Sequence, residues 1–392
     1  MSAFVSCKSS DRNNSTIVAG ENKVEKQLII GAERFDEYLP ILKNKRVGLV
    51  VNQTSVVNNT HLVDTLLGLG VNIIKVFAPE HGFRGNHSAG AVIKNGLDEK
   101  SGLPVVSLYG KNKKPTEEML IDLDVVVFDI QDVGVRFYTY ISTMHYVMEA
   151  CAENNKKVIV LDRPNPNGFY VDGPVLDLKY QSFIGMHAIP IVHGLTVGEL
   201  ANMINSEKWL KGGITCDVAV ISCLNYNHQD LYQLPIKPSP NLPNMNSVYL
   251  YPYLGLFEGT NVSIGRGTDR PFQIVGRPGE FGKLQFKPMP IPGVSDHPKH
   301  EGEICGGEVV LDAIDSTLFK SPKLNLEWLV KFYKTNSVEN GPYFKNFFYK
   351  LTGTSSLKTQ IERGLTDYEI RSSWKPKLDE YNRNRKKYLL YP

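Results

Sequence analysis

Side chains able to do acid–base chemistry follow four separate apolar runs in the first half of the chain. Glu80 stands in the segment Pro79-Glu80-His81-Gly82, where proline fixes the backbone before the carboxyl and glycine allows a sharp turn after it. A carboxyl held rigidly beside apolar groups is suited to act as a general acid. A helix cap or a salt bridge is the structural alternative for a lone glutamate. The four run ends together carry Asn52, Gln53, Glu80, His81, Asp129, Gln131, Asp132, Asp162 and Arg163.

Asp129 and Asp132 are the candidates for a second catalytic carboxylate. Asp129 occupies a strand position where an apolar residue is expected, and this is costly unless the carboxylate is used or paired. Hydrogen bonding to loop amides is the alternative role for Asp129. Arg136, Tyr138 and Tyr140 follow in the segment VGVRFYTY. They could clamp an acidic substrate group and stack on a sugar ring, or they could pack within the loop.

Two segments of the second half are also candidates. His193 lies in IVHGLT at a possible strand end, although a lone histidine is more often structural. Segment 254–272 places short polar side chains between glycines, so it can direct many hydrogen bonds at a polyhydroxylated ligand or can cap itself at the surface. Asn241, within PSPNLPN at 238–244, belongs to a possible rigid wall. The polar residues of the glycine-rich segment are Glu258, Thr260, Asn261, Ser263, Arg266, Thr268 and Asp269.

Several common ligand-binding motifs are absent from the sequence. No GxGxxG follows the first apolar run and no GxxxxGK[ST] occurs, so a dinucleotide or nucleoside triphosphate is disfavoured. No GxSxG is present, which disfavours serine-hydrolase chemistry. Glu80, His81, Asp129 and His193 match no metal-ligand spacing such as HExxH. We therefore expect no metal, no nucleotide and no other cofactor.

The elements that position these residues are predicted from apolar periodicity. Continuous Val- and Ile-rich runs at 46–51, 72–78, 124–130 and 157–161 are typical of parallel strands buried on both faces, and 105–108 is a possible further strand. Helical patterns occupy 60–69 and 139–154. Alternating strands and helices predict an α/β fold with a doubly wound parallel sheet, in which ligands bind at the carboxyl ends of the strands.

The second half is organised differently, after a proline-rich break near 165–190. We expect a helix at 196–207 with Thr196 as its cap, a short strand at 216–222, long ordered loops over 234–294, and helices at 324–335, 355–363 and 366–388. These patterns predict a disordered tether at 1–26, a catalytic sheet domain at 27–185, and a smaller α/β domain at 186–392 that closes the cleft.

Composition is that of an ordinary globular protein of 392 residues. Its 44 Lys and Arg nearly balance 41 Asp and Glu, so we expect no nucleic-acid partner. No stretch approaches the roughly 18 apolar residues of a transmembrane helix.

The segment Phe4-Val5-Ser6-Cys7 is similar to the end of a bacterial lipoprotein signal, so Cys7 is either a lipid anchor or a chance cysteine in the tether.

Six motifs in fixed order, together with the C-terminal KYLLYP, resemble the exo-β-N-acetylmuramidase family, formerly a domain of unknown function. The resemblance covers residues 27–392. It implies a Rossmann-like domain that binds no dinucleotide, with the active site in the cleft beside a smaller domain. The motifs are APEHGFRG (78–85), FDIQDVGVRFYTY (128–140), VLDRPNP (160–166), HGLTVGELA (193–201), PSPNLP (238–243) and YPYLGLFEGTNVSIGRGTDRPF (251–272).

The resemblance also implies an activity, the removal of terminal N-acetylmuramic acid from the non-reducing end of peptidoglycan fragments. The glutamate of the PEHG motif is the family's proposed catalytic residue, which is Glu80 here. The second catalytic group is then Asp129, Asp132 or the substrate's own acetamido group. Arg136 or Arg266 could pair with the lactyl carboxylate.

We expect a periplasmic or cell-envelope location. A surface lipoprotein that binds muropeptides without cleaving them and an enzyme acting on another amino sugar or on a cell-wall amide are the alternatives.

Overall fold

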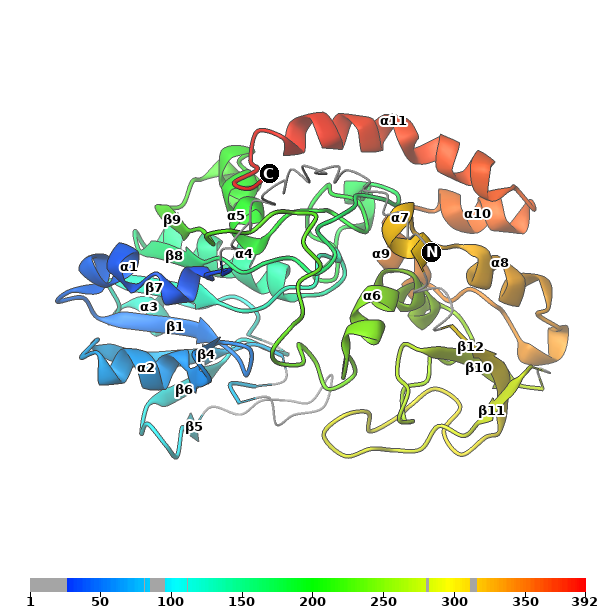
Figure 1. Cartoon of the computed structure of the whole chain (residues 1–392), viewed down its shortest axis with the longest axis horizontal. Coiled ribbons are helices and arrows are strands. Elements are labelled where there is room, and N and C mark those ends of the chain that lie inside the picture. Colours follow the sequence, from blue (N-terminus) through cyan, green and yellow to red (C-terminus); the bar gives the residue numbers. More distant parts are fainter. Residues whose placement is uncertain (1–26, 81, 85–95, 111, 280–281, 311–315) are drawn as a thin grey trace, which may run out of the picture.

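The computed structural model describes residues 27–80, 82–84, 96–110, 112–279, 282–310 and 316–392. These residues form two domains, a larger one around a seven-stranded sheet and a smaller one around a three-stranded sheet (Figure 1). The fold is therefore the predicted combination of a doubly wound α/β domain with a smaller α/β domain. The predicted tether at 1–26, with Cys7, lies outside the described residues, so it stays a prediction.

The large sheet has β1 as its central strand, with three further strands on each side. Its six longer strands are parallel, and the short β5 adds to one edge in the antiparallel sense. The chain order is reversed beside β1, which places the topological switch point of a Rossmann-like sheet between β1 and β7. Across the sheet the strands are β5 (Gly96–Leu97), β6 (Pro104–Ser107), β4 (Ile73–Ala78), β1 (Val47–Val51), β7 (Val125–Asp129), β8 (Lys157–Leu161) and β9 (Val218–Ile221).

Both faces of this sheet are covered, which explains why its strands are mostly apolar. Val126 and Phe128 of β7 belong to the core shared with α4 (Tyr140–Glu153) and α5 (Val197–Ser206). Val125 and Val127 belong to the opposite core, shared with α1 (Phe35–Leu42) and α2 (Leu62–Gly68). Successive side chains of a strand point to opposite faces, so a run without polar residues requires two apolar layers. The remaining elements of this domain are η1 (Gly31–Glu33), β2 (Val56–Val57), β3 (Thr60–His61), α3 (Glu117–Leu120), η2 (Leu178–Tyr180) and η3 (Lys211–Gly213).

The sheet domain extends beyond residue 185, where we expected it to end. The helix α5 and the strand β9 both come later in the chain, and β9 pairs with β8 in parallel. Thr196 caps α5 as predicted, because its hydroxyl oxygen accepts the amide proton of Glu199 at 3.2 Å. The proline-rich stretch near 165–190 is thus a connection within the domain. Prolines mark irregular backbone, but they do not reveal whether a later strand returns to the same sheet.

The smaller domain contains an antiparallel sheet in the order β10-β12-β11 and a set of helices. The helix α6 (Met245–Leu254) lies within the stretch where we expected only loops. Every residue of this helix from Ser247 to Leu254 is buried, and the helix contains Pro252, so no amphipathic period marks it. The other elements are η4 (Gly255–Gly259), β10 (Ile274–Pro278), β11 (Leu284–Phe286), β12 (Cys305–Val309), α7 (Ser316–Lys320), α8 (Glu327–Lys334), η6 (Val338–Asn340), α9 (Phe347–Thr352), α10 (Ser356–Glu362) and α11 (Asp367–Arg385).

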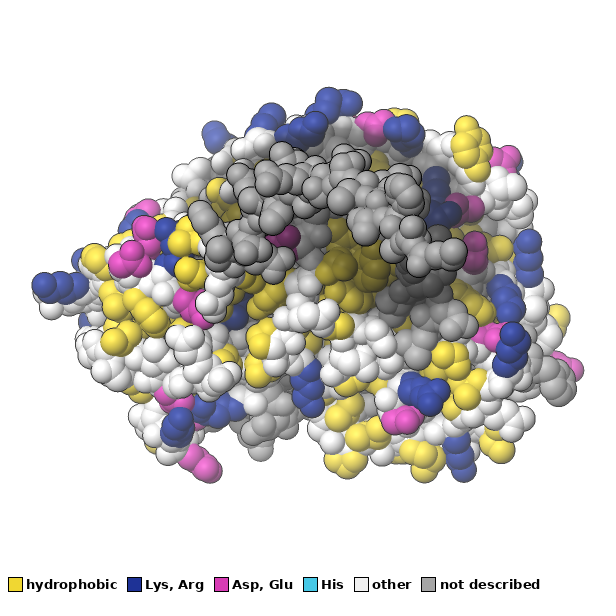
Figure 2. Space-filling view, in the orientation of Figure 1, with side chains coloured by type: hydrophobic (Ala, Val, Ile, Leu, Met, Phe, Trp, Pro, Cys, Tyr) yellow, Lys and Arg dark blue, Asp and Glu magenta, His cyan; other side chains and the backbone are white. Residues whose placement is uncertain are grey.

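The helix α11 carries the chain back from the smaller domain, and the C-terminus comes to lie beside α5 (Figure 1). Lys and Arg side chains gather along this upper edge of the molecule in the space-filling view (Figure 2). At the end of the chain, the Tyr391 hydroxyl donates to Asp162 Oδ2 at 2.5 Å and accepts from the Cys223 amide at 2.9 Å. Asp162 follows β8 and Cys223 follows β9, so the tail is anchored to the sheet domain.

Replacing Tyr391 by Phe is expected to lower the free energy of unfolding by about 1–3 kcal/mol, because a buried amide and a buried carboxylate each lose a partner. Urea denaturation followed by circular dichroism measures this change. Tyr368→Phe is the matched control, since Tyr368 on α11 is 80% exposed and its hydroxyl should contribute little. Equal stabilities for the two variants would show that the tail anchor adds nothing.

Candidate active site

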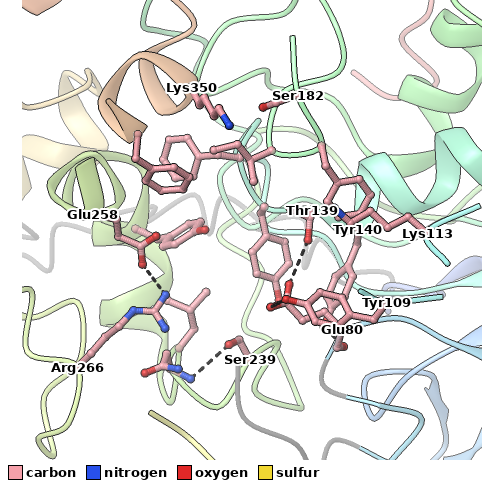
Figure 3. Close-up of a pocket in the computed structure, with 18 of the residues that line it drawn as sticks. Glu80, Tyr109, Lys113, Thr139, Tyr140, Ser182, Ser239, Glu258, Arg266 and Lys350 are labelled. Carbon is pink, nitrogen blue, oxygen red and sulfur yellow. Dashed lines mark hydrogen bonds and ion pairs between the residues drawn. The ribbon is translucent and has the colours of Figure 1, made fainter. Parts of the chain in front are cut away.

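A cavity of about 560 Å³ lies at the carboxyl edge of the large sheet. One side is formed by the segments that follow β4, β6 and β7, and the other by α6, η4 and the glycine-rich segment after them (Figure 3). This location agrees with the rule that open α/β sheets bind ligands beyond the carboxyl ends of their strands. Among the described residues that line the cavity, Glu80 and Glu258 are the carboxylates.

Glu80 follows β4 and is held by hydroxyl groups from two neighbouring segments. The Tyr109 hydroxyl donates to Glu80 Oε1 at 3.0 Å, and the Thr139 hydroxyl donates to Oε2 at 3.3 Å. The Tyr140 hydroxyl donates to the Glu80 carbonyl at 3.4 Å. Burial and the neighbouring Glu80 raise the pKa of Tyr109 above its usual value, so its hydroxyl keeps the proton that it donates. The carboxyl group is therefore fixed in one orientation facing the cavity (Figure 3).

Glu258 faces the cavity from the opposite side and forms an ion pair with Arg266 (Figure 3). The Arg266 guanidinium also lies 5.1 Å from the centre of the Phe272 ring. The loop that carries Glu258 is fixed by the half-buried Lys299, which donates to the carbonyls of Phe257, Thr260 and Val262 at 2.6–3.0 Å. Burial lowers the pKa of Lys299 to about 7.

Aromatic rings provide the apolar part of the lining. Tyr138 packs edge-on against Tyr140 and Tyr251, with ring centres 5.0 and 5.8 Å apart. The Tyr138 hydroxyl donates to the Pro238 carbonyl at 2.7 Å, which attaches the 238–244 segment to this cluster. Asn241 of that segment lines the cavity and donates to the Val294 carbonyl. Carboxylates beside aromatic rings suit a polar ring such as a sugar, which offers hydroxyls to the former and C–H faces to the latter.

Asp129, our first candidate for the second catalytic carboxylate, lies outside the cavity. Its two oxygens accept from Arg163 Nε at 2.5 Å and Nη2 at 2.8 Å, and both side chains are buried. The polar strand position is thus explained by pairing. A carboxylate engaged in this way is not placed to contact a substrate in the cavity, so the geometry does not support Asp129 as a catalytic group.

Arg136, predicted to clamp an acidic substrate group, is also fully buried outside the cavity. Its guanidinium donates to the carbonyls of Pro174, Ile189 and Leu351 at 2.7–2.9 Å. Arg136 therefore joins the 174–189 segment to α9, which is a structural role.

Four more predicted residues support the backbone below the cavity. Asn52 Oδ1 accepts from the amide and the hydroxyl of Thr54, and Gln131 Nε2 donates to the Asp132 and Pro164 carbonyls. Asp132 Oδ2 accepts from the Gly134 amide and lies 3.6 Å from His193 Nε2. These side chains are all buried and do not line the cavity.

The other predicted residues either form hydrogen bonds elsewhere in the protein or line the cavity. Asp162 accepts hydrogen bonds from Thr196, Gly198 and Tyr391, and burial raises its pKa to about 6. Thr260 and Thr268 donate to carbonyls three residues earlier, so the glycine-rich segment partly caps itself. Asn261 donates to Asn336 and to the Asn340 carbonyl. His81 lies outside the described residues. Of all the predicted site residues, the cavity is lined by Glu80, Tyr138, Tyr140, Asn241, Glu258 and Arg266.

Several lining residues were not predicted. Tyr109 follows β6, so applying the strand-end rule to the uncertain strand at 105–108 would have found it. Thr139 and Tyr251 lie inside motifs that were singled out for other residues. Lys113, Ser182 and Lys350 carry no local signal, because distant segments bring them to the cavity.

Within the described parts of the chain, no group of three His, Cys, Asp or Glu side chains could hold a metal ion. No helix of those parts is long and apolar enough to cross a membrane.

A doubly wound domain whose strand-end cavity combines two carboxylates with aromatic walls is suited to a protein that acts on sugars. Two family descriptions match nearly the whole chain: "Exo-beta-N-acetylmuramidase NamZ, N-terminal" matches residues 47–246, and "Exo-beta-N-acetylmuramidase NamZ, C-terminal" matches residues 249–391. The chain belongs to the exo-β-N-acetylmuramidase family. The boundary between the two family matches falls after β9, so every strand of the large sheet at or after β1 lies within the N-terminal match.

Individual relatives agree with this assignment. The peptidoglycan β-N-acetylmuramidase NamZ of Bacillus subtilis (strain 168) is 40% identical over 375 residues, which cover 91% of this chain and 89% of that protein. The crystal structures of two DUF1343 family proteins from Bacteroides fragilis are also similar to this chain. Each match includes 93% of this chain and 99% of the Bacteroides protein. One is 46% identical with a TM-score of 0.85, and the other is 32% identical with a TM-score of 0.79.

Proposed function

We propose that this chain is an exo-acting glycoside hydrolase that releases terminal N-acetylmuramic acid from the non-reducing end of peptidoglycan fragments. The observation that carries the proposal is Glu80, fixed by two hydroxyl groups in a strand-end cavity of a chain from this family. The cavity volume of about 560 Å³ suits one or two sugar rings. Such a volume fits removal of a terminal unit better than binding of a long glycan strand.

Glu80 is the general acid in this proposal. It gives its proton to the oxygen of the β-1,4 bond as that bond breaks, so that the leaving sugar departs as a neutral alcohol. The cleaved sugar develops positive charge at its anomeric carbon, which either a second carboxylate or its own 2-acetamido oxygen can stabilise. Glu258 is the second carboxylate of the cavity, but its pairing with Arg266 already engages it. We therefore favour the acetamido group as the second catalytic group.

Incubation of the purified protein with the disaccharide N-acetylmuramic acid–N-acetylglucosamine, followed by mass spectrometry, tests the proposed activity. Release of both monosaccharides is the expected result. An intact disaccharide that nevertheless raises the melting temperature would instead support a binding protein. An intact disaccharide without any thermal shift would contradict both functions.

Replacing Glu258 by Gln tests the choice of second group. We expect kcat to fall about 10-fold, because Arg266 loses its partner while the reacting acetamido group stays on the substrate. Steady-state kinetics on the same disaccharide measure this, with Glu308→Gln as the control, since Glu308 pairs with Lys331 at the surface. A loss of about 10³-fold or more would make Glu258 the nucleophile or base.

A further inference from the structure

The charges around the cavity are distributed unevenly. Its ionic lining consists of Glu80, Glu258, Lys113, Arg266 and Lys350. Because Arg266 is paired with Glu258, that side carries little net charge. No carboxylate of the described residues forms an ion pair with Lys113 or Lys350. The lining thus contains two ammonium groups, those of Lys113 and Lys350, that pair with no carboxylate of the described residues.

The cationic wall of the cavity consists of Lys113, Ser182, Phe183 and Lys350. Lys350 comes from α9, and Lys113 lies with its ammonium 4.4 Å from the centre of the Phe183 ring. Ser182 and Gly185 exchange backbone hydrogen bonds in a tight turn that presents Ser182 and Phe183 to the cavity. Figure 3 shows Lys350 beside Ser182 at the rim of the cavity. The Ser182 hydroxyl oxygen is buried and has no hydrogen-bond partner among the described residues.

The wall is held together by buried contacts rather than by chance proximity of surface side chains. Arg136 binds carbonyls of the two segments that form the wall. Pro174 and Ile189 flank the segment that contains Ser182, and Leu351 belongs to α9, which carries Lys350. The Asp177 amide donates to the Gly353 carbonyl just after α9, and the Tyr180 and Tyr349 rings stack with centres 6.0 Å apart. The backbone segments that carry Ser182 and Lys350 are therefore held side by side although they are far apart in sequence.

We infer that the cationic wall binds the free lactyl carboxylate of N-acetylmuramic acid and thereby selects this sugar over N-acetylglucosamine. The inference rests on the proposed function and names the residues that determine its specificity. The two sugars differ by the lactyl ether, whose carboxylate needs cationic donors such as the Lys113 and Lys350 ammonium groups of this wall. Arg266 is less suitable, because binding the carboxylate would compete with its pairing to Glu258.

Kinetics on three substrates test the inference: N-acetylmuramic acid–N-acetylglucosamine, the same disaccharide with its lactyl group as an amide, and N,N′-diacetylchitobiose. For Lys350→Met and Lys113→Met we expect KM for the first substrate to rise about 10- to 100-fold, the range for loss of a charged hydrogen bond, with kcat nearly unchanged. The two neutral substrates should react with the variants as slowly as with the wild type. Lys350→Arg should recover part of the loss.

Lys375→Met is the matched control, because Lys375 pairs with Asp379 on the exposed side of α11 and removal of its charge leaves the cavity unaltered. If the wild type cleaves the free-acid disaccharide but both Lys variants keep its preference over the two neutral substrates, the inference is wrong and the proposed function stands. If the wild type cleaves none of the three, the proposed function itself fails. An equal loss on all three substrates would mean that the lysines support the cavity's shape.

Discussion

Replacing Glu80 by Gln should lower kcat on the free-acid disaccharide by about 10³-fold or more while KM stays within a few-fold of the wild type. Gln has the shape of Glu, and its carbonyl oxygen can still accept a hydrogen bond from Tyr109. It has no proton to give to the leaving oxygen, so the loss falls on the chemical step. Thermal unfolding of the variant should remain close to that of the wild type.

The leaving group distinguishes a general acid from other roles of Glu80. A 4-nitrophenyl glycoside of N-acetylmuramic acid departs as a stable phenolate and needs little protonation. We therefore expect Glu80→Gln to recover much of its rate on this substrate, whereas a nucleophile variant would stay inactive on both. Tyr109→Phe is the matched control, since it removes one hydrogen bond to Glu80 but keeps the carboxyl. Near-normal turnover of the natural bond by a folded Gln variant would falsify the assignment.

Replacing Asp129 by Asn is expected to destabilise the protein by about 3–5 kcal/mol, the usual cost of leaving a buried charge without its partner. The Asp129 side chain is fully buried and the Arg163 side chain is 2% exposed, so water cannot compensate the guanidinium. Asn keeps the size of Asp but removes the negative charge. Thermal and urea unfolding measure the loss, and kcat per folded molecule at low temperature should remain near the wild-type value.

A double variant makes the Asp129 prediction specific. Asp129→Leu combined with Arg163→Met removes both charges and should recover a large part of the stability lost by either single change, because no unpaired ion remains. Strong loss of activity in a normally stable Asp129→Asn protein would restore Asp129 as a catalytic residue. Equal destabilisation by the single and double variants would mean that size, rather than charge pairing, determines stability here.

The large sheet could be predicted because its signals are local. Val47–Val51 and Val125–Asp129 are apolar runs whose composition alone indicates buried parallel strands, and each ends in polar residues. The rule for open sheets then placed the candidate site at the edge where the cavity lies, and Glu80 is one of the residues that line it. The helix α6 was missed because its residues Ser247–Leu254 are all buried, and a helix buried around its circumference has no amphipathic period. β9 was assigned to the wrong domain because strand pairing depends on contacts distant in sequence.

The sequence by itself determined that this chain forms a doubly wound α/β domain with Glu80 at the carboxyl edge of its sheet, since the type of each strand and helix depends on local composition. The tertiary structure alone decided which polar residues face the cavity. Asp129 and Arg136 were as plausible as Glu80 by residue type, but Arg163 and three distant carbonyls engage them. Lys350 and Ser182 reach the cavity only through folding. A buried polar group takes the partner that packing brings to it, and the local sequence does not specify that partner.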